Sequence, residues 1–136
     1  IMGLVVKKIN VGEVASIKGI YKAKNYEKYL FNDYRLYDTY RNSVTFGVFD
    51  NKKMVGVIRL VGDFQYVIYI EDMITLDEYS NTDAKKLLIE EVLERYAKVE
   101  KIFCNLKHRS KETASVYLDL GFAPADENEL LVKIKE

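Results

Sequence analysis

The fold is decided by Val55-Gly56-Val57-Ile58-Arg59-Leu60-Val61-Gly62-Asp63 and, further along, Tyr69-Ile70-Glu71-Asp72-Met73-Ile74-Thr75-Leu76-Asp77-Glu78-Tyr79. The first stretch is typical of a β-strand that ends in a turn at Gly62-Asp63. Between Tyr66 and Leu76 the even and the odd positions are both largely apolar, which is typical of a central strand covered on both faces. Two carboxylates, Glu71 and Asp72, stand out towards the end of this strand.

The elements on either side follow from the same kind of pattern. Val44–Phe49 and Met54–Val61 flank a turn-forming cluster and are expected to pair as a hairpin. Further strands are expected at Leu4–Ile9, Lys101–Leu106 and Leu130–Ile134, and helices at Thr82–Lys98 and Ser110–Leu120. This order predicts an α/β (α+β) fold with a mixed, mostly antiparallel sheet flanked by helices.

Composition limits the kinds of protein that this chain can be. No linker or repeat divides residues 1–136, so a single domain is expected. The 21 basic residues balance the 21 acidic ones, which disfavours a nucleic-acid partner. No apolar run approaches the ~20 residues that span a bilayer, so no membrane partner is expected. One cysteine and one histidine exclude an internal disulfide and a structural zinc site; with no evident signal peptide, we expect a cytoplasmic protein.

The segment Val11–Arg41 is rich in tyrosine and has the spacing of one or two amphipathic helices. Its tyrosines are Tyr21, Tyr26, Tyr29, Tyr34, Tyr37 and Tyr40. Two interpretations are open: the rings pack in the core, or some of the phenols line a substrate pocket.

Two motifs carry a resemblance to a known family. Residues 55–79 are similar to the "GxxRxxGD…YIxDxxVxPEY" run of small bacterial members of the GNAT acetyltransferase superfamily. Val116-Tyr117-Leu118-Asp119-Leu120-Gly121-Phe122 is similar to that family's "FYxxLGF". The resemblance covers the chain well from Val44 onward and weakly before it. It implies the GNAT fold, with acetyl-CoA as the co-substrate.

The resemblance also implies how acetyl-CoA binds. The pantetheine amides pair with the splayed end of the central strand, at Ile74 and Thr75. The pyrophosphate sits at the N-terminus of the next helix, where free N–H groups favour anions. That loop consists of Ser80, Asn81, Thr82, Asp83, Ala84 and Lys85. Tyr117 matches the tyrosine that gives a proton to the departing CoA thiolate, as a general acid.

The phosphate loop departs from the family pattern, which is written Q/R-x-x-G-x-G/A. Ser80, Asp83 and Lys85 occupy its three defining positions. Glycine lets the backbone approach a pyrophosphate, whereas an Asp adds negative charge and is itself a good helix cap. Either the backbone and the charges of Lys85 and Lys86 retain acetyl-CoA, or the helix caps itself and the domain is a non-catalytic module.

Several polar groups are candidates for the remaining chemistry. The segment Lys107-His108-Arg109-Ser110-Lys111 begins the last helix beside the implied cleft; its charges, that of Lys111 included, hold a CoA phosphate or form a solvated turn. The substrate amine must lose a proton before it attacks. Glu71 is the first candidate base, on the expectation that it is partly buried. Asp72 is the second, with a structural hydrogen bond to a loop as the alternative reading; a water chain replacing any dedicated base is also open.

The single cysteine, Cys104, is expected to be a small buried hydrophobe, because the sequence names no base to activate it. The sequence as a whole predicts an N-acetyltransferase that moves an acetyl group from acetyl-CoA to a primary amine of a small molecule or peptide by direct attack. The alternative is a non-catalytic domain of the same fold that binds a ligand or a protein. Exposed strand edges make a homodimer a reasonable expectation.

Overall fold

The computed structural model describes residues 3–106, 110–125 and 131–134. Within these residues the sheet has five strands, in the order β1-β2-β3-β4-β5. They are β1 (Leu4–Ile9), β2 (Val44–Asp50), β3 (Lys53–Gly62), β4 (Val67–Thr75) and β5 (Lys101–Cys104). The first three junctions are antiparallel, whereas β4 and β5 are parallel. The mixed, mostly antiparallel sheet is therefore confirmed.

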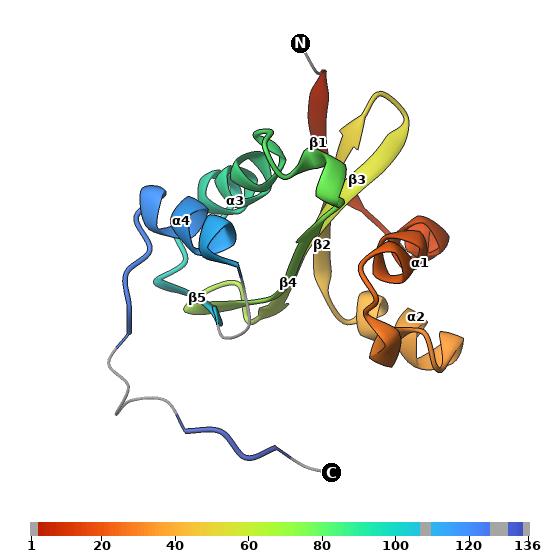
Figure 1. Cartoon of the computed structure of the whole chain (residues 1–136). Coiled ribbons are helices and arrows are strands. Elements are labelled where there is room, and N and C mark those ends of the chain that lie inside the picture. Colours follow the sequence, from red (N-terminus) through yellow and green to blue (C-terminus); the bar gives the residue numbers. More distant parts are fainter. Residues whose placement is uncertain (1–2, 107–109, 126–130, 135–136) are drawn as a thin grey trace.

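Helices flank this sheet, as expected for the α/β fold. They are α1 (Val14–Ala23), α2 (Asp33–Arg41), α3 (Ala84–Arg95) and α4 (Lys111–Asp119), with the short 3₁₀ turns η1 (Val11–Glu13), η2 (Glu27–Tyr29) and η3 (Asp77–Tyr79). Figure 1 shows α1 and α2 together on one side of the sheet, and α3 and α4 on the other. Among the described residues, no helix is long and apolar enough to span a bilayer.

Gly62 and Asp63 build the turn that joins β3 to β4. Gly62 has a φ of 152°, and a Cβ there would lie 2.3 Å from the carbonyl oxygen of Val67. The Asp63 carboxylate accepts hydrogen bonds from the backbone N–H groups of Val67, Gln65 and Tyr66, at 3.0, 2.9 and 2.8 Å. These bonds lower the pKa of Asp63. The two residues therefore set the register in which β4 returns along β3.

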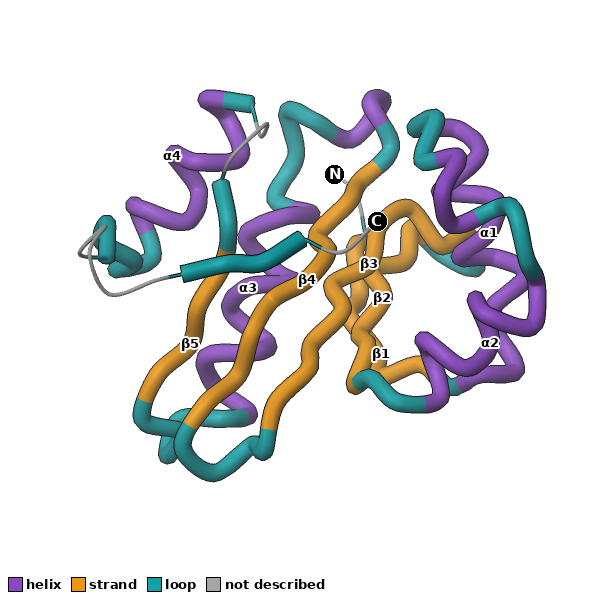
Figure 2. Tube along the Cα trace, turned by 90° about the horizontal axis from the view of Figure 1, so that it is seen from below, coloured by secondary structure: helices purple, strands orange, loops and turns teal. Residues whose placement is uncertain are grey.

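β4 is irregular at the position of its two carboxylates. Arg59 pairs with Asp72 and Leu60 with Ile70, so Glu71 is the extra residue of a β-bulge. On its other edge, β4 pairs with β5 only as far as Ile70. Figure 2 shows the two strands diverging beyond that point. Within the described residues, the last part of β4 thus has one edge without a neighbouring strand.

The tyrosines of the N-terminal region divide between core and surface. Tyr21 and Tyr40 are buried, Tyr26 and Tyr29 are half-buried, and Tyr34 and Tyr37 are exposed. The ring of Tyr21 stacks on Tyr29 at 4.4 Å between centroids and on Tyr26 at 5.8 Å. Core packing therefore accounts for part of the aromatic stripe, and the half-buried rings are placed to line cavities.

The expected last strand, Leu130–Ile134, is wrong for the residues that the structure describes. Residues 131–134 form no strand, and the side chains of Leu131, Val132 and Ile134 are 92%, 79% and 82% exposed. Leu130 lies outside the described residues. Alternating apolar side chains favour a strand only where a neighbouring strand covers them. Within the described ranges, no strand pairs with the outer edge of β5.

Candidate functional site

A cleft of about 280 Å³ opens along the part of β4 that follows Ile70 and no longer pairs with β5. β4 and the residue after it contribute Met73, Ile74, Thr75 and Leu76. The other sides come from the residues after α1, from the turn before α3 with the first turn of α3, and from the start of α4. They contribute Lys24 and Tyr26, then Asp77, Ser80 and Lys85, and finally Ser110, Glu112 and Thr113. Four segments that are distant in sequence therefore meet at the unpaired edge of β4.

The N-terminus of α3 is open at one end of this cleft. Asp83 occupies the N-cap position and is exposed, and its side chain makes no capping hydrogen bond. Thr82 caps instead: its hydroxyl accepts from the backbone N–H of Ala84 at 3.3 Å and donates to the carbonyl oxygen of Tyr79 at 2.7 Å. Within the described part of the chain, the backbone N–H groups of Lys85 and Lys86 have no acceptor, whereas that of Leu87 donates to the carbonyl oxygen of Asp83 at 2.8 Å. The self-capping by Asp83 considered above is therefore not seen.

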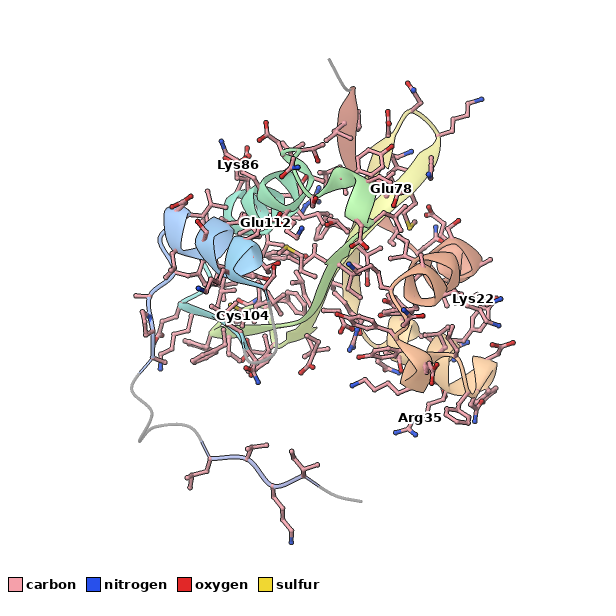
Figure 3. All side chains as sticks on the ribbon, viewed as in Figure 1. Lys22, Arg35, Glu78, Lys86, Cys104 and Glu112 are labelled. Carbon is pink, nitrogen blue, oxygen red and sulfur yellow. The ribbon has the colours of Figure 1, made fainter. Side chains whose placement is uncertain are left out.

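Two ion pairs tie the walls of the cleft together. The Lys85 ammonium lies 3.1 Å from the Glu112 carboxylate and links α3 to α4; Figure 3 labels Glu112 at the start of α4. Lys24, which follows α1, pairs with Asp77 of η3, and this hydrogen bond with its charge lowers the pKa of Asp77. The cleft therefore holds two lysines, each already balanced by a carboxylate.

The residues expected to bind the cofactor divide into two groups. Ile74, Thr75, Ser80 and Lys85 line the cleft. Asn81, Thr82, Asp83 and Ala84 complete the turn into α3 without lining the cleft, and Lys111 is exposed at the start of α4. Its neighbours Ser110, Glu112 and Thr113 line the cleft in its place.

Sequence reasoning missed these three neighbours. The sequence feature that could have identified them is the serine that caps α4: the Ser110 hydroxyl accepts a hydrogen bond from the backbone N–H of Thr113 at 3.1 Å.

Tyr117 is buried in α4, with 3% of its surface exposed. Its ring packs edge-on against Phe122, with 5.1 Å between the centroids. Tyr117 follows Thr113 by one helical turn, so the two residues share a face of α4. Thr113 lines the cleft, whereas Tyr117 does not.

The two carboxylates of β4 have opposite environments. Glu71 is exposed at the bulge, so the expectation that it is partly buried is wrong. The bulge explains the difference, because its extra residue lies outside the regular pairing of the sheet. Asp72 is 3% exposed and accepts hydrogen bonds from Arg59 Nε at 2.8 Å, and from the hydroxyls of Tyr21 and Tyr29 at 3.2 Å each. Its partners lie on β3, α1 and η2 and not on a loop.

Arg59 is the centre of this buried network. It also donates to the hydroxyl of Ser43 at 3.2 Å and to that of Tyr29 at 3.5 Å. Burial disfavours its charge, but the Asp72 carboxylate outweighs burial and raises the pKa of Arg59. Burial, and then the charge of Asp72, raises the pKa of Tyr29 to about 12. At neutral pH the phenol is therefore a hydrogen-bond donor beside a charged guanidinium.

Of the remaining candidates, Cys104 lies within the described residues and does not line the cleft. Cys104 is half-buried at the end of β5. Lys107, His108 and Arg109 lie outside the described residues. Within the described residues, no group of His, Cys, Asp and Glu is suited to hold a metal ion.

Comparisons with known proteins agree with this geometry. A model of the acetyltransferase (GNAT) family matches residues 13–122. A GNAT-family acetyltransferase from Streptococcus pneumoniae TIGR4 is similar in structure, with a TM-score of 0.80 and 20% identity over 98% of this chain and 97% of that one. No curated protein sequence matches significantly.

Two further solved structures have the same fold. An aminoglycoside acetyltransferase from an uncultured soil metagenomic sample, in complex with sisomicin, has a TM-score of 0.76 and 14% identity over 97% of both chains. A ribosomal-protein-alanine N-acetyltransferase from Brucella melitensis biovar Abortus 2308 has a TM-score of 0.74 and 10% identity over 97% of this chain and 100% of that one. At these identities the likeness concerns the fold.

Proposed function

The chain belongs to the acetyltransferase (GNAT) family, and from this we propose that it moves an acetyl group from acetyl-CoA to a primary amine of a small molecule or peptide. The observation that carries the proposal is the cleft along the unpaired edge of β4, which leads to the open N-terminus of α3. A ligand with amides at one end and a diphosphate at the other matches a free strand edge followed by a helix N-terminus.

The chain supplies a partner for each part of this co-substrate. The backbone of residues 73–75 offers the free edge to the pantetheine amides. The backbone N–H groups at the start of α3 face the pyrophosphate, and the Lys85 ammonium adds a positive charge within the cleft. The altered loop is consistent with binding, since the Asp83 carboxylate leaves these N–H groups open.

The transfer is a direct attack of the amine on the thioester. The amine nitrogen forms a bond to the carbonyl carbon, the carbon–sulfur bond breaks, and the thiolate leaves. Glu71, exposed at the bulge, takes the proton of the amine directly or through water. Tyr117 gives a proton to the thiolate. Asp72 holds the strand and the N-terminal helices in place, because its oxygens already accept three hydrogen bonds.

A second candidate is a non-catalytic binding module of the same fold. The observation that favours it is the negative charge near the phosphate site. Asp83 stands at the N-cap of α3, and Glu112 already neutralises Lys85. An anion at this helix N-terminus meets both carboxylates.

Thermal unfolding with and without acetyl-CoA separates the two candidates. At about a hundred times its Kd, the ligand stabilises the fold by roughly 2.7 kcal/mol, or about 9 °C in Tm for a domain of this size. Lys85→Gln should reduce the shift, whereas Lys98→Gln, an exposed lysine beyond the end of α3, should leave it unchanged. No shift for the natural chain would overturn the proposal. Release of free thiol with an added amine then measures the transfer.

A further inference from the structure

A second cavity, of about 740 Å³, lies outside the cofactor cleft. The segment from η2 to α2 forms most of its wall, and Arg59 of β3 lines it from the sheet. Its volume is in the range of small-molecule sites. Tyr29 and Phe31 provide aromatic surface, and the Phe31 side chain is 89% exposed.

The charged groups that line this cavity are all positive: Lys28, Arg35 and Arg59. Arg59 is balanced by Asp72. Lys28 and Arg35 are exposed and form no ion pair within the described residues. Lys28 Nζ lies 4.9 Å from the centroid of the Tyr29 ring. Figure 3 shows the Arg35 side chain extending away from α2.

The nearby carboxylates do not cancel these two charges. Asp33 at the start of α2 lies 2.7 Å from the Lys18 ammonium, and Asp38 pairs with Arg41. Neither acid lines the cavity. Two positive charges, those of Lys28 and Arg35, are therefore available to a ligand.

The cavity adjoins the cofactor cleft through one aromatic stack. Tyr26 lines the cleft and Tyr29 lines the cavity, and both rings stack on the buried ring of Tyr21. Tyr29 also hydrogen-bonds to Asp72, the residue of β4 that directly precedes the part lining the cleft. The rings of Tyr26 and Tyr29 are themselves 6.4 Å apart between centroids, so a ligand held in the cavity lies beside the cofactor cleft, next to this group of rings.

We infer that this cavity binds the acceptor, and that the acceptor is a primary amine that also carries a carboxylate, of the size of an amino acid or a short peptide. The inference rests on the proposed acetyl transfer. A guanidinium binds a carboxylate with two parallel hydrogen bonds, and an ammonium adds a second charge. The exposed aromatic surface covers an apolar body. A polycation such as an aminoglycoside meets like charge in this cavity.

Two dipeptides test the charge preference directly. Glycyl-L-phenylalanine and glycyl-L-phenylalaninamide have the same amine, far from the group that differs, and only the first carries a carboxylate. Their binding to the whole chain is measured by NMR titration with and without acetyl-CoA, alongside sisomicin. Their acetylation is measured by thiol release. We expect the acid to bind about tenfold more tightly than the amide, as one charge-assisted contact provides.

Variants assign the preference to the cavity. Arg35→Gln should remove most of the advantage of the acid, because only the ammonium of Lys28 is then left for the carboxylate, and should leave binding of the amide unchanged. Lys22→Gln removes the same charge from an exposed site on α1 outside the cavity, labelled in Figure 3, and should retain the advantage. Equal binding of acid and amide, tighter binding of sisomicin, or no binding of the acid would overturn the inference. Preferred binding of the acid without any thiol release would leave the carboxylate preference of the cavity standing and overturn both the proposed transfer and the role of the bound molecule as acceptor.

Discussion

Replacing Asp72 by Asn separates a structural role of this carboxylate from a catalytic one. The side chain keeps its shape but loses its charge, and Arg59, whose side chain is 9% exposed, is left without its counter-charge. Removing one partner of a buried ion pair costs about 3–5 kcal/mol. For a domain of this length, that loss lowers Tm by about 10–17 °C. Such a loss is a large part of the total stability of a typical domain.

The assay is urea unfolding followed by far-UV circular dichroism, since the chain contains no tryptophan. The midpoint should fall while the slope with urea stays unchanged, because the surface exposed on unfolding is the same. The matched control is Glu71→Gln, the same chemical change at the preceding residue, which is exposed. Its stability should change by less than about 0.5 kcal/mol.

The double variant Arg59→Gln with Asp72→Asn completes a double-mutant cycle, which measures the interaction energy between the two side chains. It leaves two neutral groups that can hydrogen-bond to each other, so it should be less destabilised than the sum of the single variants. The reasoning would be refuted if Asp72→Asn unfolds within about 1 kcal/mol of the natural chain, a cost typical of one ordinary hydrogen bond. A large loss of turnover in that stable variant would make Asp72 the base instead of Glu71.

Four further changes test other parts of the site. Asp83→Gly should tighten acetyl-CoA binding in calorimetry, because it removes a negative charge and a Cβ beside the pyrophosphate; weaker binding would contradict the loop argument. Glu112→Gln releases Lys85 and should lower the Kd of acetyl-CoA about two- to fivefold, whereas an unchanged Kd would show that Lys85 does not reach the ligand. Tyr117→Phe should lower kcat by about 10²–10⁴ with an unchanged Kd for acetyl-CoA; an equal kcat would remove Tyr117 from the mechanism. The pKa of Asp63 is lowered in the fold, so its stabilisation is present above about pH 4 and is lost on further acidification; urea unfolding of Asp63→Asn should lack this dependence, and an unchanged acid limb would exclude Asp63 as its source.

The order of the elements could be predicted because local patterns determine it. The turn at Gly62-Asp63 needs a residue that adopts a positive φ and a side chain that accepts hydrogen bonds. A glycine followed by an aspartate indicates both in the sequence. The strand expected at Leu130–Ile134 failed for the described residues because alternation states only which face is apolar. Whether a strand forms there depends on a partner, and that is a property of the whole sheet.

The candidate site could be predicted only in part. Ile74 and Thr75 line the cleft as expected, because the divergence of two strands exposes the end of β4. The pairing of Arg59 with Asp72 was also within reach, since opposite charges stood in two adjacent apolar strands. The second cavity could not be predicted, because it depends on how η2 and α2 pack, and the spacing of tyrosines does not determine that packing.

Arg59 and Asp72, the arginine and the aspartate of the family motif at residues 55–79, therefore contribute to the architecture more than to catalysis. Arg59 and Asp72 are joined in the core, where they tie β3 and β4 to α1 and η2. By contrast, α3 is anchored to the sheet by Ala84, Leu88 and other buried residues, while Asp83 is exposed. Changes at the phosphate loop thus cost the fold little, since exposed positions contribute little to stability. Affinity for acetyl-CoA can vary at the start of α3 independently of the core, which is why binding of the co-substrate is the decisive measurement for this chain.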